Sequence, residues 1–122
     1  MTPLLFDSNI LIDGLRNIRE GMAEIDACRD RYISRITWIE VLAGATANDA
    51  ERIEEFLSLF TIVEITEDVA RRAARIRERG RRPHLMDVLI LASAQAIGAT
   101  LVTRNTKDFP ADMPGILVPY TL

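Results

Sequence analysis

The sequence has few of the side chains that commonly act as nucleophiles, bases or soft metal ligands. Its 122 residues include one cysteine, Cys28, and one histidine, His84. A single cysteine excludes an internal disulfide and any multi-cysteine metal site. A single histidine excludes zinc centres built on histidine pairs, and it leaves little room for catalytic triads or for ribonuclease chemistry that uses two imidazoles. The carboxylates are therefore the candidate catalytic groups.

Phosphate-binding glycine loops and long apolar segments are also missing. The six glycines never approach the spacing G-x-G-x-x-G, and no G-x-x-x-x-G-K-[ST] loop occurs. The longest unbroken apolar run, residues 88–92, is too short to span a bilayer. The N-terminus has no basic segment and meets a carboxylate at Asp7, which argues against a signal peptide. We expect a single cytoplasmic domain over residues 1–122 with no membrane contact.

Charge is distributed unevenly along the chain. There are 15 basic and 18 acidic residues, which gives a net charge of −3. Seven arginines and one acid, Glu78, fall between Arg71 and Arg82, so this segment carries +6 and the rest of the chain −9. Such a basic segment could attract a polyanion, although a solvated helix face that aids solubility explains it equally well.

Short apolar segments that predict strands alternate with segments that predict helices. The expected strands are residues 4–6, 32–34, 61–65, 100–103 and 116–118, and the expected helices are residues 10–15, 20–31, 37–43, 49–60, 66–79 and 85–97. Asn48 and Thr66 are expected N-caps, and the segment 85–97 is apolar enough to be mostly buried. Strands that are apolar without alternation predict an α/β sandwich on a mainly parallel sheet.

Three carboxylates stand in apolar surroundings. Asp7 follows the first predicted strand directly, with Asn9 two residues on, where its amide could orient the Asp7 carboxylate. Glu40 has apolar neighbours on both sides, and Asp87 interrupts a segment otherwise suited to the core. A carboxylate buried alone would cost several kcal/mol, on the order of the penalty for a buried ion, so such a group is often paired or functional.

Each of these acids also has a purely structural interpretation. Asp7 could be a helix N-cap. Glu40 could bond back to the amide of Thr37 in a capping box. Asp87 could be a first-turn acid favoured by the helix dipole, or it could pair with an upstream arginine.

Taken together, the three acids suggest a metal site. If they converge at the carboxyl ends of parallel strands, they repel one another, and a divalent cation relieves that repulsion. Oxygen ligands without histidine or cysteine favour Mg²⁺ or Mn²⁺ over zinc. Carboxylates around Mg²⁺ suit phosphodiester hydrolysis, in which metal ions activate water and stabilise the leaving oxygen.

Four blocks of the sequence resemble a known family in their order and spacing. They are residues 5–11 around Asp7-Ser8-Asn9, residues 33–44 around Glu40, residues 86–92 around Asp87, and residues 101–109 with Thr103-Arg104-Asn105 and Asp108. They resemble the PIN-domain ribonucleases, specifically the VapC toxins of bacterial toxin–antitoxin pairs. The resemblance implies a PIN-like three-layer sandwich, with a mainly parallel five-stranded sheet flanked by helices, and a Mg²⁺-dependent endoribonuclease activity, with Mn²⁺ as the alternative ion.

The resemblance also implies which residues form the site. Asp7, Glu40 and Asp87 would hold the metal. Many PIN domains carry a fourth aspartate where Asn105 stands, whereas here the acid comes later, at Asp108, and either residue could supply the fourth group. Asn9, Thr103 and Asn105 are the expected supporting residues. The candidate RNA contacts are Arg71, Arg75, Arg79, Arg82 and Arg104.

The implied partners are an RNA substrate (transfer or ribosomal RNA), a second copy of the chain, and a VapB-like antitoxin that covers the acidic groove. Two alternatives stay open. A haloacid-dehalogenase-like phosphatase would need an aspartate where Asn9 stands and a lysine that only Lys107 could supply. A catalytically inactive PIN-like module that binds protein or RNA would keep its acids for structural reasons, and Asn105 is the feature that favours it.

Overall fold

Five short parallel strands in one sheet organise the fold. The structure is a computed structural model that describes residues 2–78 and 84–122. The strands are β1 (Leu4–Phe6), β2 (Arg31–Ser34), β3 (Thr61–Val63), β4 (Thr100–Val102) and β5 (Ile116–Leu117). They lie in the order β3-β2-β1-β4-β5, and every neighbouring pair is parallel. The predicted parallel five-stranded sheet is confirmed.

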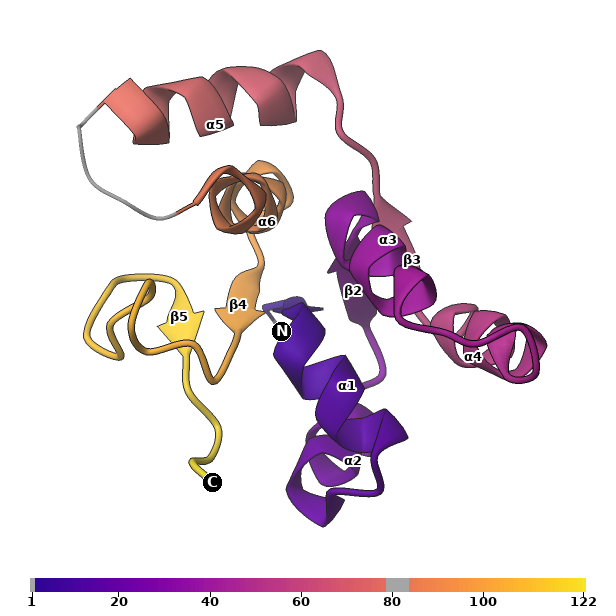
Figure 1. The fold of residues 1–122 in the computed structure, drawn as a ribbon. Helices are drawn as coiled ribbons and strands as arrows, with labels where there is room; N and C mark the ends of the chain where they lie inside the picture. The colour runs from indigo at the N-terminus through magenta and orange to yellow at the C-terminus, as the bar shows by residue number, and fades with distance from the viewer. Residues whose placement is uncertain (1, 79–83) are drawn as a thin grey trace.

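Helices cover both faces of this sheet. They are α1 (Ser8–Leu15), α2 (Arg19–Asp26), α3 (Arg35–Ala43), α4 (Ala50–Leu57), α5 (Glu67–Glu78) and α6 (Leu85–Ala96). Figure 1 shows α1 and α2 on one face and α6 on the other, with α5 packed over α6. Helix α3 starts directly after β2 and contacts α1, α4 and α6. This arrangement confirms the predicted α/β sandwich. Among the described residues, no helix combines the length and apolar character needed to cross a membrane.

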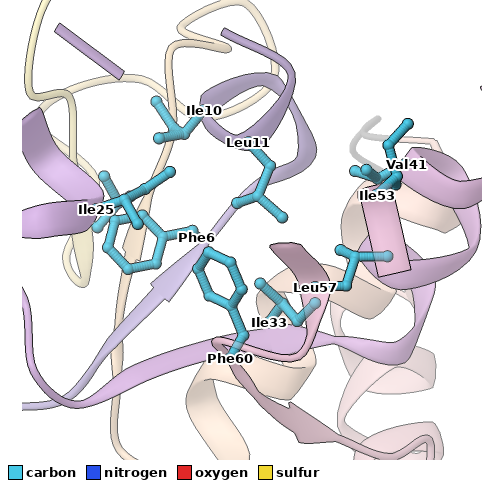
Figure 2. Packing of buried hydrophobic residues seen from close by; sticks show 10 residues of the cluster. Phe6, Ile10, Leu11, Ile25, Ile33, Val41, Ile53, Leu57 and Phe60 are labelled. Carbon is cyan, nitrogen blue, oxygen red and sulfur yellow. The ribbon is translucent and has the colours of Figure 1, made fainter. Parts of the chain in front are cut away.

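The central strand β1 is buried on both faces, so its successive side chains enter different cores. Phe6 packs with α1, α2 and α4 residues on one side (Figure 2), where it meets the ring of Phe60 edge to face at 6.0 Å between centroids. Leu5 packs on the other side with Ile90 of α6, Leu101 of β4 and Phe109. Fixing β1 from both faces also fixes the residue that follows it, Asp7.

One local prediction was wrong. Helix α4 begins at Ala50 with Asp49, not Asn48, as its N-cap, because the Asp49 carboxylate accepts hydrogen bonds from the backbone and hydroxyl of Thr46 in the preceding turn. The apolar segment 85–97 is mostly buried or half-buried, as predicted; its exposed residues are Gln95 and, in the first turn, Leu85 and Met86, which are 54% and 39% exposed. Hydrophobic periodicity identified helix α6 correctly, but it does not show that the first turn of this helix extends beyond the elements that cover the rest of it. The predicted cap at Thr66 is confirmed, since its hydroxyl accepts from the Val69 amide at 3.2 Å.

Helices α1 and α2 pack closely because glycine stands at their contact. A Cβ added at Gly21 would lie 2.9 Å from Cβ of Asp13, 3.0 Å from the backbone nitrogen of Gly14 and 3.1 Å from the Tyr120 hydroxyl. Backbone atoms at this distance cannot move aside cheaply, so Gly21 is required by close approach.

We expect Gly21→Ala to lower the free energy of unfolding by about 1–3 kcal/mol, the usual cost of overpacking, despite the better helix propensity of alanine. Urea denaturation followed by circular dichroism measures this change. Glu20→Ala, at an exposed position of the same helix, is the matched control and should change stability by less than about 0.5 kcal/mol. Equal stability of the two variants would show that the contact is not tight.

Candidate active site

Asp7 lies at the carboxyl edge of the sheet and is held from two directions. Phe6 pairs with Val102 across β1 and β4, and the Asp7 amide donates to the Val102 carbonyl at 2.9 Å. The Thr103 hydroxyl donates to Oδ2 of Asp7 at 2.7 Å, and the Ser8 amide donates to Oδ1 at 2.7 Å. Asp7 is therefore the N-cap of α1, as its structural interpretation proposed, and its second oxygen is bound to the residue after β4.

Asn9 supports Asp7 in the way its spacing predicted. Its Nδ2 donates to Oδ2 of Asp7 and to Oγ1 of Thr103, each at 3.3 Å. Its Oδ1 accepts from the backbone amide of Arg104 at 3.2 Å. One side chain on α1 thus contacts both the acid and the backbone that follows β4.

Glu40 on α3 points to the same place, and its capping-box interpretation was wrong. Helix α3 begins at Arg35 with Ser34 as N-cap, so Thr37 lies inside the helix and cannot cap it. Instead, the Ser8 hydroxyl donates to Oε1 of Glu40 at 2.5 Å and lies 3.3 Å from the Thr37 hydroxyl. Ser8, which we did not single out from the sequence, joins the chain after β1 to α3.

Asp87 and Asp108 belong to two other elements, helix α6 and the loop that follows β4. Asp87 stands in the first turn of α6, and Asp108 lies in the loop that follows β4. The Asn105 side chain holds this loop: its Nδ2 donates to Oδ2 of Asp108 at 3.0 Å, and its Oδ1 accepts from the Asp108 amide at 3.3 Å. The Asn105 amide in turn donates to Oγ1 of Thr103 at 2.9 Å.

The electrostatics show that the four acids share one environment. Burial raises the pKa of Asp7 despite its hydrogen bonds from Thr103 and Ser8, and the carboxylates of Glu40 and Asp108 raise it further. Burial, then the charges of Asp7 and Asp108, a hydrogen bond with Asp108 and the charge of Glu40 raise the pKa of Asp87 to about 6. The structure therefore brings Asp7, Glu40, Asp87 and Asp108 into mutual electrostatic range.

The four candidate groups are all carboxylates, and their oxygen atoms suit a hard divalent cation better than a metal ion that prefers nitrogen or sulfur ligands. As placed, however, the described residues contain no group of three Asp, Glu, His or Cys side chains that could hold a metal ion. The side chains would have to draw closer around a cation. His84 is exposed at the start of α6 and makes no side-chain cap there.

A buried acid that the sequence reasoning missed lies beside this site. Asp13 on α1 is 3% exposed and accepts from Nε and Nη2 of Arg104 at 2.6 and 2.8 Å, and from the Tyr120 hydroxyl at 2.7 Å. An acid inside the apolar run 10–15 was the available signal. Arg104, a predicted RNA contact, has its guanidinium committed to Asp13 in this structure.

The described part of the basic segment, residues 71–78, lies on α5, which packs against α6 (Figure 1). Arg71 pairs with Glu67 at 2.9 Å and Arg72 with Asp68 at 3.1 Å, so part of the predicted stripe is neutralised on its own helix. Arg75 is exposed. The candidate RNA contacts Arg79 and Arg82 lie outside the described residues.

Comparison with known proteins places the chain in a family. The PIN domain description matches residues 4–111, which is most of the chain. The chain belongs to the PIN-domain family. Among curated relatives of this PIN-domain protein, Ribonuclease VapC19 of Mycobacterium tuberculosis is 32% identical over 124 residues, which cover 95% of this chain and 98% of the relative. Ribonuclease VapC10 of the same species is 31% identical over 114 residues, covering 88% and 86%.

Solved structures agree with this assignment. A chain of a toxin–antitoxin complex from Klebsiella pneumoniae is 41% identical and superposes with a TM-score of 0.90, covering 98% of this chain and 99% of that one. A chain of FitAcB from Neisseria gonorrhoeae is 27% identical with a TM-score of 0.79, covering 95% and 97%. The predicted resemblance to the VapC group of PIN domains is confirmed.

The raised pKa of Asp87 predicts how the metal-free protein responds to pH. A carboxyl whose folded pKa is raised favours the protonated folded state, so its contribution to stability is lost as pH rises from about 4 through about 6. In EDTA at pH 7 we expect Asp87→Asn to unfold at higher urea than the wild type, with the difference shrinking toward pH 4. Asp112→Asn, at an exposed carboxyl, should match the wild type at both pH values. An Asp87→Asn protein no more stable than wild type at pH 7 would contradict the charge clustering.

Proposed function

We propose that this PIN-domain protein is a divalent-metal-dependent endoribonuclease that acts in the cytoplasm as the toxin of a VapBC-type pair. The observation that carries the proposal is the convergence of Asp7, Glu40, Asp87 and Asp108 at one edge of the sheet, with the pKa of Asp7 and Asp87 raised by burial and by the neighbouring acids. Relatives named as ribonucleases and a structural neighbour described as a toxin–antitoxin complex support it. The substrate is transfer or ribosomal RNA, and the active form is a homodimer of single-domain chains, residues 1–122.

Asp7, Glu40 and Asp87 would hold Mg²⁺, or Mn²⁺ in its place. When bound, such an ion supplies Lewis acidity toward water and toward the oxygens of a phosphodiester. The chain's own residues orient the carboxylates: Thr103 and Asn9 direct Oδ2 of Asp7, and Ser8 directs Oε1 of Glu40.

Asp108 is the better candidate for the fourth site group, with Asn105 as the residue that orients it. The amide of Asn105 is engaged on both its nitrogen and its oxygen by Asp108. The charge of Asp108 in turn acts on both Asp7 and Asp87. In this proposal, the Asp108 carboxylate takes the role that many other PIN domains give to an aspartate at the position of Asn105.

The antitoxin would be a VapB-like protein that covers the acidic groove. A hollow of about 240 Å³ adjoins Glu40 between α1, α3 and α4. It combines apolar walls with charged groups, and its lining residues besides Glu40 are Ile12, Leu15, Arg16, Val41, Gly44, Asp49, Arg52 and Ile53. Such a lining suits an amphipathic peptide segment whose charged residue reaches the acids.

One alternative keeps specific support. A catalytically inactive PIN-like module that binds protein or RNA would retain the fold, and it agrees with the absence, among the described residues, of three side chains already placed to hold a metal. The phosphatase alternative has no such support, because Asn9 is used as a hydrogen-bond donor to Asp7 where that chemistry needs a second acid.

The nuclease proposal predicts cleavage that depends on both metal and Asp87. The purified chain, free of antitoxin, should cut total cellular RNA into discrete fragments with Mg²⁺ and leave it intact in EDTA. Asp87→Asn should lose at least about 100-fold in rate, the scale expected when a charged group that stabilises the reaction is removed. Asp112→Asn, purified identically, controls for contaminating ribonucleases. If the Asp87→Asn and wild-type preparations cut alike, the inactive-module alternative takes precedence.

The basic surface of α5 predicts a salt-dependent contribution to RNA binding. In an Asp87→Asn background, which keeps the RNA intact, Arg75→Ala should weaken binding and lower the slope of log Kd against log salt by about 0.7, the value for one phosphate contact on a single strand. Arg29→Ala, at an exposed arginine before β2, should leave the slope unchanged. Identical slopes for the two variants would identify the α5 arginines as a solvated surface.

A further inference from the structure

Asp13 is a buried acid that the proposed chemistry leaves without a role. It is one of two acidic residues in the buried set of the described chain, and the other is Asp7. A carboxylate this enclosed is tolerated only when its oxygens are paired. Here Arg104 donates to both oxygens, at 2.6 and 2.8 Å, and the Tyr120 hydroxyl donates to Oδ2 at 2.7 Å. Burial raises the pKa of Asp13, but these bonds and the Arg104 charge outweigh it and hold that pKa below its usual value.

This cluster is tied to the acidic site through the backbone. Arg104 directly follows Thr103, whose hydroxyl donates to Asp7 at 2.7 Å. The Arg104 amide donates to Oδ1 of Asn9, which is the residue whose Nδ2 donates to Asp7. The segment after β4 is therefore held against α1 twice, by the Arg104 side chain on Asp13 and by its main chain on Asn9.

The packing around the cluster is built to admit Tyr120. The position facing it on α2 is Gly21, where a Cβ would come within 3.1 Å of the Tyr120 hydroxyl and 2.9 Å of Cβ of Asp13. The absence of a side chain at Gly21 thus leaves room for the C-terminal segment to reach a helix more than a hundred residues earlier in the chain, since Tyr120 and Asp13 are 107 positions apart.

We propose that Asp13 and Tyr120 are positioning residues for the acidic site. They hold the Arg104 guanidinium, and through it the backbone after β4, so that Thr103 and Asn9 keep the Asp7 carboxylate directed into the site. In this proposal the two residues act through Arg104, which they hold by hydrogen bonds. This inference rests on the proposed nuclease function for its kinetic consequence, whereas the placement of Asn9 and Arg104 can be measured without any activity.

The test compares Tyr120→Phe and Asp13→Asn with Glu64→Gln. Tyr120→Phe removes one hydrogen bond and keeps the ring, so a folded protein is expected even if Asp13→Asn fails to fold. Glu64→Gln weakens an exposed bidentate pair with Arg35 that includes none of the residues around Asp13, and it is the matched control. Each protein is assayed on an RNA that the wild type cleaves, and its free energy of unfolding is measured so that rates refer to folded protein.

The expected result is a fall in kcat of about 10- to 100-fold for Tyr120→Phe and Asp13→Asn, the range seen when a supporting hydrogen bond behind a metal-binding residue is lost, with KM little changed. In metal-free ¹⁵N-labelled protein, the Asn9 side-chain amide and the Arg104 backbone amide signals should shift in Tyr120→Phe and stay in place in Glu64→Gln. Loss of stability with wild-type kcat and unmoved Asn9 and Arg104 signals would overturn the proposal and leave a purely structural ion pair.

The two proposals fail separately. If the wild type cleaves no RNA, the proposed function fails, and the Asn9 and Arg104 signals still decide whether Tyr120 positions the segment after β4. If the wild type cleaves RNA and Tyr120→Phe matches it in kcat and in these signals, the positioning role fails while the nuclease stands.

Discussion

The parallel pairing of β1 with β4 is the constraint on which the rest of the site depends. Because Phe6 lies beside Val102, the residues that follow, Asp7 and Thr103, leave the sheet at the same edge and bond to each other across 96 positions of sequence. Every other contact of Asp7 follows from this pairing, since the helix it caps begins there and Asn9 on that helix reaches the backbone after β4. A parallel sheet buried on both faces supplies the rigid base that such an arrangement needs.

The four acids at this edge carry an electrostatic cost that their neighbours offset only in part. Thr103, Ser8 and Asn105 donate hydrogen bonds to three different carboxylates, yet burial and mutual repulsion still raise the pKa of Asp7 and Asp87. Asp13 behaves in the opposite way. Its side chain is as little exposed as that of Asp7, but hydrogen bonds from Arg104 and Tyr120 lower its pKa. The contrast separates the acids that we propose receive a cation from one whose charge an arginine already neutralises.

Sequence patterns predicted the elements well because each depends on neighbouring residues. Among the described residues, hydrophobic patterning identified each of the five strands and six helices, and the acids in apolar surroundings, Asp7, Glu40 and Asp87, lie within electrostatic range of one another. The errors arose where a short sequence motif was compatible with more than one local structure. Ser34 and Thr37 are both residue types that cap helices. Helix α3 begins directly after β2 with Ser34 as its N-cap, so Glu40 does not form the predicted capping box with Thr37. Asp13 was passed over although it interrupts the apolar segment 10–15, because nothing in that segment identifies its partners Arg104 and Tyr120, which lie 91 and 107 positions away.

The sequence by itself determined the kind and order of the secondary structure and the oxygen chemistry of the candidate site, because hydrophobic periodicity and side-chain type are local properties. Only the tertiary structure decided which polar groups meet: Ser8 with Glu40 and Thr103 with Asp7 across the sheet edge, and Arg104 and Tyr120 with Asp13 beneath it. These contacts join segments that strand order and helix packing bring together. No pattern of neighbouring residues encodes them, since their partners lie tens of positions away.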